Sequence, residues 1–157
     1  MSKNYTLNED GSFLIKDYNK TSAFSNFLPG IAGEWGMPLW VFYVNRGQGV
    51  VSFGIQDKDH SILEFYPANK AYSFSSSLGF RTFIKVNKDK FYEPFNSCSN
   101  IRNEMVVSSS SLELKETNQK LGLETTVKYF TLPNTSVAAL VRLVTVKNIS
   151  RKNLNIE

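Results

Sequence analysis

Residues 38–67, PLWVFYVNRGQGVVSFGIQDKDHSILEFYP, decide the fold class of this chain. The stretch contains three apolar runs, separated by polar breaks at residues 45–49 and 57–60. The runs are rich in Val, Ile, Phe, Tyr and Trp, and each is about 5–8 residues long, which is typical of strands and too short for stable helices. Gly47 and Gly49 can adopt the positive φ angles of a tight turn. The pattern predicts a three-stranded antiparallel meander.

The rest of the chain repeats this pattern of short apolar runs and turn signals. Phe24, Phe27 and Leu28 are spaced at i, i+3 and i+4, which predicts a single helical turn within residues 21–28. Residues 28–36, with three glycines and a proline, are expected to form a closely packed loop. Residues 87–90 are expected to form a turn, and residues 94–103 are expected to be irregular. The other predicted strands are 5–17 (a hairpin or an entering edge strand), 71–75, 80–86, 91–92, 104–108, 111–117 and 121–132.

The apolar run at residues 137–146 is nearly continuous, which predicts a strand buried on both faces. With it the chain contains about ten to twelve short strands at the spacing of a two-sheet sandwich. We therefore predict an all-β, antiparallel β-sandwich with little helix, and a single domain over residues 1–157.

Composition limits the functional classes. Hydrophobic residues make up 41% and charged residues 20% of the 157 residues, and the net charge of +4 is dispersed, so no basic stripe indicates nucleic-acid binding. No apolar run reaches the ~20 residues that cross a bilayer, and the polar N-terminal segment lacks the apolar core of a signal peptide. A single cysteine, Cys98, allows no intrachain disulfide and suits a reducing compartment. We expect a soluble, cytoplasmic domain.

The chain carries few groups for catalysis. His60, the only histidine, lies in a predicted turn beside Asp57 and Asp59, where a surface position is expected rather than a metal site. No nucleophile elbow and no phosphate-binding glycine-rich motif is present, so no catalytic residue, metal or cofactor is predicted. Glu64 is expected to be partly buried, and a structural pair with Arg46 or Arg81 explains that position as well as a catalytic role does. A standalone hydrolase would need two carboxylates about 5–10 Å apart in one cleft.

Aromatic residues make up 13% of the chain and suggest contact with sugars, because aromatic rings stack on the C–H faces of pyranoses. Trp40, Phe42, Phe53 and Phe65 are expected in the core, whereas Trp35, in a glycine-flanked loop, is expected to be exposed. The substrate-binding candidates are Trp35, Asn45, Arg46, Gln48 and Arg81.

Several motifs together resemble the start of cellobiose phosphorylase-like proteins (glycoside phosphorylases of glycoside hydrolase family ninety-four type). The resemblance covers roughly residues 13–157. The motifs that carry it are FLPGIAG at 27–33, PLWVFYVNRGQG at 38–49, SFG at 52–54, EFYPA at 64–68 with AY at 71–72, and GFRTF at 79–83.

The resemblance implies an N-terminal β-sandwich of the supersandwich, galactose mutarotase-like type. In such proteins the sandwich precedes an (α/α)6-barrel, and the barrel holds the general acid and the phosphate site. The resemblance therefore assigns no catalytic residue to this chain. The implied function is a non-catalytic carbohydrate-binding-type domain with an oligosaccharide or β-glucoside as ligand. The alternative is a structural or oligomerisation domain that packs on the barrel or forms a homodimer.

Residues 154–157 alternate like the beginning of a strand. We therefore expect the chain to be the front part of a larger multidomain protein, with a genuine short terminal strand as the alternative.

Overall fold

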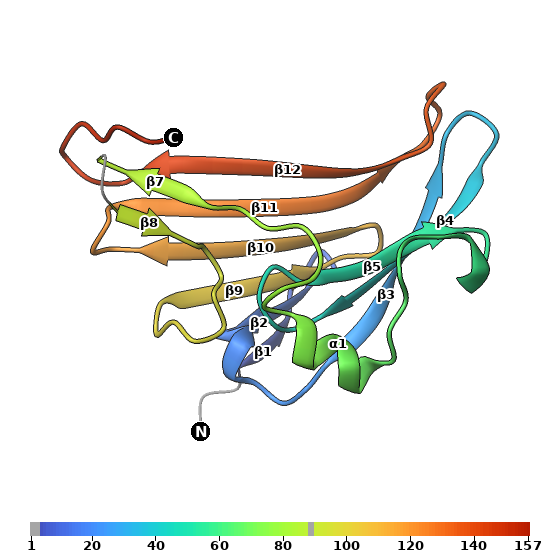
Figure 1. The fold of residues 1–157 in the computed structure, drawn as a ribbon, viewed down its shortest axis with the longest axis horizontal. Helices are drawn as coiled ribbons and strands as arrows, with labels where there is room; N and C mark the ends of the chain where they lie inside the picture. The colour runs from blue at the N-terminus through green and yellow to red at the C-terminus, as the bar shows by residue number, and fades with distance from the viewer. Residues whose placement is uncertain (1–3, 88–89) are drawn as a thin grey trace.

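The computed structural model describes residues 4–87 and 90–157. A six-stranded antiparallel sheet, in the order β1-β2-β9-β10-β11-β12, faces a four-stranded sheet, β3-β4-β5-β6, and the hairpin β7-β8 lies beside the larger sheet (Figure 1). The elements are β1 Tyr5–Leu7, β2 Phe13–Lys16, η1 Tyr18–Lys20, β3 Ser25–Ala32, β4 Met37–Val44, β5 Val50–Ile55, η2 Lys58–His60, β6 Ser61–Leu63, α1 Ala68–Phe74, β7 Ile84–Val86, β8 Lys90–Tyr92, β9 Arg102–Val107, β10 Ser111–Asn118, β11 Leu123–Leu132 and β12 Ala139–Asn148.

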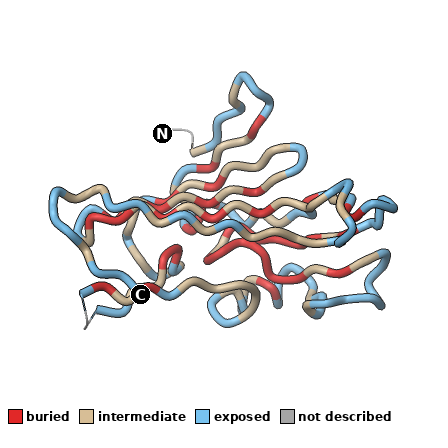
Figure 2. The backbone as a smooth tube through the Cα atoms, turned by 90° about the horizontal axis from the view of Figure 1, so that it is seen from above, coloured by how far each residue is buried: buried red, intermediate tan, exposed pale blue. Residues whose placement is uncertain are grey.

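The core lies between the two sheets. On β10 and β11 every second residue is buried, including Leu112, Leu114, Val127 and Tyr129, because successive side chains of a strand point to opposite faces. These side chains belong to the same apolar cluster as Val41 of the smaller sheet. In Figure 2 the buried segments gather where the sheets face one another, while the loops at both ends of the molecule are exposed. The predicted all-β antiparallel sandwich is confirmed.

The predicted meander is also confirmed. β4 pairs with β5, and β5 with β6, all antiparallel. β1 and β2 form the hairpin expected near the N-terminus.

The helical turn predicted within residues 21–28 is wrong, and the loop predicted at 28–36 is correct only for residues 33–36. Residues 25–32 form β3, which pairs along its whole length with β4. The i, i+3, i+4 apolar spacing was misleading because pairing with β4 overrides local periodicity. Pro29 has no backbone N–H to donate. It is tolerated because β3 is an edge strand, which pairs with a neighbouring strand on one side only. Gly30 allows close contact with β11, since a Cβ there would lie 2.2 Å from Thr131 Cγ2.

Two other expectations in the middle of the chain need correction, and a third falls partly outside the described residues. Residues 71–75 are not a strand: α1 covers Ala68–Phe74 and packs Ala71 against Phe42 and Val51. Of residues 80–86, only Ile84–Val86 form a strand. The turn predicted at residues 87–90 falls partly on Lys88 and Asp89, which lie outside the described residues.

β12 is not buried on both faces. It is the edge strand of the larger sheet, so its inner side packs Leu140 and Val144 on the core while Leu143 on the other side is 54% exposed. After β12 the chain turns back, and Ile156 pairs with Val86 of β7. Within residues 4–87 and 90–157, no helix is long and apolar enough to cross a membrane.

Candidate functional site

The five residues singled out from the sequence do not form one site. Asn45, Arg46 and Gln48 lie in the turn that follows β4, whereas Trp35 precedes this strand, in the turn between β3 and β4. The eight residues of β4 lie between them, which corresponds to roughly 25 Å along an extended strand. Trp35 is 93% exposed, as expected, but it is not a neighbour of the Asn45 turn.

Asn45 is fully buried and its hydrogen-bonding groups are occupied within the fold. Its side-chain nitrogen donates to three oxygens of residues 18–22 at 2.8–3.2 Å. Its Oδ1 accepts from the Phe24 backbone N–H at 2.8 Å and from the Tyr72 hydroxyl at 2.6 Å. These contacts connect the turn to the segment before β3 and to α1, so the Asn45 side chain acts as an internal anchor.

Arg46 also points into the protein. Its guanidinium donates to the backbone oxygens of Tyr18, Asn45 and Thr21 at 2.7–3.0 Å and lies 5.5 Å from the centre of the Tyr72 ring. A charge-assisted set of this kind rigidifies the turn.

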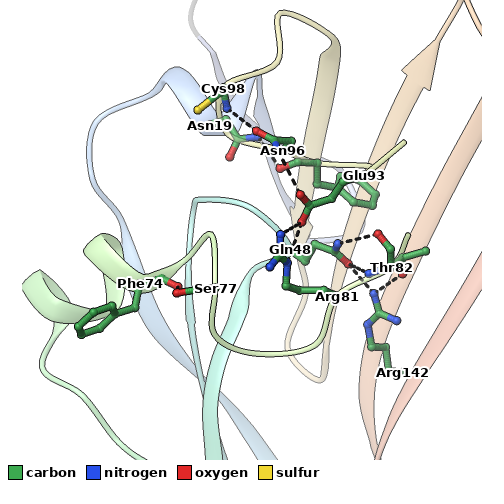
Figure 3. Close-up of polar contacts among 11 residues, drawn as sticks. Asn19, Gln48, Phe74, Ser77, Arg81, Thr82, Glu93, Asn96, Cys98 and Arg142 are labelled. Carbon is green, nitrogen blue, oxygen red and sulfur yellow. Dashed lines mark hydrogen bonds and ion pairs between the residues drawn. The ribbon is translucent and has the colours of Figure 1, made fainter. Parts of the chain in front are cut away.

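Gln48 connects the two sheets through a second buried network (Figure 3). Its side-chain amide exchanges hydrogen bonds with the backbone of Thr82, at 3.0 and 3.4 Å, and its Oε1 accepts from Arg142 Nη2 of β12 at 2.6 Å. Arg142 Nε donates to the hydroxyl of Tyr129 at 3.1 Å. Burial raises the pKa of the Tyr129 hydroxyl, while the neighbouring Arg142 acts in the opposite direction.

Arg81 lies near Gln48 but is paired with a carboxylate. Its Nε and Nη2 donate to Glu93 Oε1 at 2.8 and 2.6 Å (Figure 3). Its guanidinium lies over the Phe83 ring. The cavity that Arg81 and Gln48 share is about 10 Å³, about the space of one water molecule and far too small for a sugar.

A different surface has the shape and chemistry of a ligand site: a shallow cleft on the outer face of the smaller sheet. It is about 250 Å³ in volume and is lined by Phe27, Trp40, Gln56, Lys58 and Phe65, which we call the aromatic cleft. Strand alternation builds it, because Phe27 and Trp40 point away from the core while their neighbours Leu28 and Val41 point into it. α1 covers only the part of this face around Phe42 and Val51.

The rings of the cleft hold one another in position. The Phe27 and Phe65 rings are stacked with centres 6.0 Å apart, and Phe65 meets Trp40 edge to face at 5.9 Å. The Trp40 indole N–H donates to the Asp57 carbonyl at 2.9 Å, which fixes the orientation of the indole. Phe27 and Phe65 remain 46% and 36% exposed. The result is a pre-formed aromatic platform that is open to solvent.

Gln56 and Lys58 provide the polar edge of the cleft. Gln56 has a φ of 60°, a left-handed conformation that non-glycine residues adopt at an energetic cost and that is found most often at turns and functional sites. Its amide group can donate to ligand hydroxyls, and its oxygen can accept from them. The Lys58 ammonium is paired with Asp59 Oδ1 at 2.5 Å on the exposed surface, and its other N–H groups can still donate to a ligand.

Only part of this cleft could be identified from the sequence. Phe42 is buried as expected, but Phe65 is not a core residue, and Trp40 is only half-buried. Phe27 was placed on a helical turn, and Gln56 and Lys58 were not singled out. The signal for Phe27 was the alternation of Phe27, Pro29 and Ile31 with Leu28, Gly30 and Ala32, which is the pattern of a strand.

Asp57, Glu64 and Glu116 each accept hydrogen bonds from other groups of the fold. Asp57 accepts from the His60 ring at 2.8 Å in the exposed η2 turn, and this bond lowers the pKa of the Asp57 carboxyl. Glu64 is exposed and bonds to Tyr66 rather than to Arg46 or Arg81. Glu116 is a buried carboxylate that the sequence did not reveal. Among residues 4–87 and 90–157, no group of three or more His, Cys, Asp and Glu side chains could hold a metal ion.

No protein-family model matches this sequence, and no curated protein is similar to it.

Proposed function

We propose that this chain is a non-catalytic carbohydrate-binding β-sandwich domain of a glycoside phosphorylase-like protein, and that the aromatic cleft takes the sugar. The observation that carries the proposal is the open platform of Phe27, Trp40 and Phe65, with Gln56 and Lys58 at its edge. Aromatic faces stack on pyranose rings, while a few polar groups at the rim fix the orientation of the ligand.

The proposed sugar contact is the aromatic cleft and not the turn that contains Asn45. The side chains of Asn45, Arg46, Gln48 and Arg81 each bond to other parts of the fold. A bound sugar would have to displace these bonds, and each lost bond would leave a polar group unpaired. Trp35 remains a candidate for an additional contact because it lies on the β3–β4 hairpin that also carries Phe27 and Trp40.

Calorimetric titration with cellobiose, laminaribiose and sophorose tests the proposal. At least one disaccharide should release heat with the natural chain and none with the Phe65→Ala/Lys58→Ala variant. Phe91→Ala is the matched control, since Phe91 is an 80% exposed ring on β8, outside the cleft. If all three sugars give no heat, or if Phe91→Ala weakens binding as much as the cleft variant does, the cleft does not bind sugar.

A second candidate function is a structural domain that packs on a catalytic barrel. It is favoured by the uncovered outer face of β11 and β12, where Phe130, Pro133 and Leu143 line a depression of about 520 Å³. Exposed apolar surface at a sheet edge also promotes association. Light scattering of the natural chain and of Leu143→Lys discriminates between the two functions: self-association that the substitution abolishes supports packing, and a monomer at high concentration opposes it.

The cytoplasm is the compartment that we propose for this domain. Cys98 is exposed and free, a state that persists most readily where thiols are kept reduced. Fractionation of cells that produce the protein tests the location, and recovery from the medium would contradict it.

A further inference from the structure

At the end of the molecule opposite the aromatic cleft, three segments enclose a second cavity of about 520 Å³. They are the ends of β7 and β8, the turn between β10 and β11, and the loop after β12, which all lie at the left of Figure 1. We call this cavity the basic pocket. Its size is within the range of pockets that bind small molecules.

Within the part of the chain that the structure describes, the charged residues that line the basic pocket are all cationic. They are Lys90, Lys120, Arg151 and Lys152. Four cations around one hollow focus a positive potential into it, and this raises the local concentration of anions.

Neighbouring carboxylates are engaged elsewhere. Glu157 is paired with Lys85, with an Oε2–Nζ distance of 3.2 Å, and Glu124 is paired with Lys115 at 3.0 Å. Neither of these glutamates lines the pocket. Glu157 and Glu124 therefore do not balance the rim charges.

The floor of the pocket is apolar. Val86 is buried, and Leu121 and Leu154 are half-buried and pack against the same small cluster. A purely charged ligand such as free phosphate could not use this floor, whereas a ligand with an uncharged ring system could cover it and remove apolar area from water.

The cationic loop is held in a defined conformation. Asn148 donates to the Lys152 carbonyl at 2.8 Å, and its Oδ1 accepts from the Ser150 backbone N–H and hydroxyl at 2.9 and 2.7 Å. Ile149 N–H donates to the Gly122 carbonyl at 2.8 Å, which joins the loop to the turn between β10 and β11. The backbone that carries Arg151 and Lys152 is thereby pre-organised, which lowers the entropic cost of binding.

We propose that the basic pocket binds an organic phosphate of nucleotide size, with the phosphate at the Lys120–Arg151 rim and the uncharged ring on the Val86, Leu121 and Leu154 floor. This site is independent of the proposed sugar site, so either proposal can fail without the other. Lysine and arginine are the usual phosphate-binding side chains, and arginine can engage two phosphate oxygens at once.

The test is equilibrium dialysis of the full chain with AMP, adenosine and inorganic phosphate as probes. AMP should bind, and adenosine and phosphate alone should each bind at least about tenfold more weakly, since each lacks one half of the contacts. Lys120→Gln/Arg151→Gln should weaken AMP binding by about tenfold or more.

Lys20→Gln/Lys70→Gln is the control, because it removes the same charge from exposed positions outside the pocket. Thermal unfolding of both variants checks that they remain folded. The proposal is overturned if AMP does not bind, if the control variant loses as much affinity as the pocket variant, or if inorganic phosphate binds as tightly as AMP. Tighter binding of duplex DNA than of AMP, with the same sensitivity to the pocket variant, would also overturn it by indicating an open polyanion surface.

Discussion

The hydroxyl of Tyr72, on α1, donates to Oδ1 of Asn45, in the turn after β4, at 2.6 Å and across 27 positions of the chain. The Phe24 carbonyl oxygen lies 2.5 Å from the same hydroxyl and shares its single proton with Asn45. These contacts join the short helix to the turn after β4 and to the segment before β3. α1 covers the part of the outer face around Phe42 and Val51, and the aromatic cleft lies on another part of that face.

The first prediction concerns this anchor. Asn45→Ala should lower the free energy of unfolding by about 3 kcal/mol, because it leaves several buried donors and acceptors without partners. Asn26→Ala, at an exposed position of β3, should change it by no more than about 0.5 kcal/mol. Urea unfolding followed by fluorescence measures both. Similar losses in the two variants would show that Asn45 does not anchor the turn.

The second prediction concerns the Gln48–Arg142 contact. Arg142→Ala should cost about 2–3 kcal/mol, since Arg142 donates to both Gln48 and Thr82 in a half-buried setting. Arg102→Ala, whose side chain is 70% exposed and paired with Glu104, should cost less than about 1 kcal/mol.

A double-mutant cycle with Gln48→Ala then isolates the pair. Residues in one hydrogen-bonded network should show a coupling energy of about 1 kcal/mol or more. If the two substitutions lower the free energy of unfolding additively, the Gln48–Arg142 contact has no coupling energy.

The strands could be predicted from sequence wherever one face is buried. Leu112 and Leu114 of β10 alternate with polar residues because only one side of the sheet meets the core. The prediction that β12 is buried on both faces was wrong because a continuous apolar run looks the same in the sequence whether one face or both faces of the strand are covered. The difference is set by sheet order, which places β12 at an edge, and sheet order depends on pairing between distant segments.

The candidate site was harder to predict for a related reason. Asn45 and Gln48 look like exposed turn residues in the sequence, yet both are buried, because Tyr18, Thr82 and Arg142 reach them from remote segments. Conversely, Phe65 was predicted to lie in the core, yet it lines the aromatic cleft on the outer face of the smaller sheet. Which face of a strand is covered depends on α1, whose helical conformation was not predicted.

The third prediction uses two glycines with nearly equal φ angles. Gly79 has a φ of 80°, and a Cβ there would lie 2.1 Å from the Val50 carbonyl oxygen, whereas Gly11, at 79°, has nothing within 4 Å of that position. Gly11→Ala should cost about 1 kcal/mol from backbone strain alone. Gly79→Ala should cost at least about 3 kcal/mol because backbone atoms must also move. Thermal unfolding compares them, and equal losses would show that the loop yields freely at Gly79.

The fourth prediction concerns Glu116, which is 1% exposed on the inner face of β10. Burial raises the pKa of its carboxyl above the ordinary value of 4.5, although hydrogen bonds from the Tyr92 hydroxyl and the Phe95 N–H act in the opposite direction. A raised acid pKa means that the folded state holds the proton more tightly than the unfolded state does. The stabilisation is fully present below the unfolded value and is lost as the pH rises through the folded value.

Glu116→Gln removes this titration while keeping a side chain of the same shape. The free energy of unfolding of the natural chain, minus that of Glu116→Gln, should therefore fall as the pH rises above about 4.5 and level off above the folded pKa. Urea titrations across this pH range measure the difference, and Glu113→Gln, on the opposite face of β10, controls for loss of one carboxylate from the strand. A difference that increases with pH would mean that the hydrogen bonds from Tyr92 and Phe95 outweigh burial, and that Glu116 is held as a carboxylate inside the sandwich.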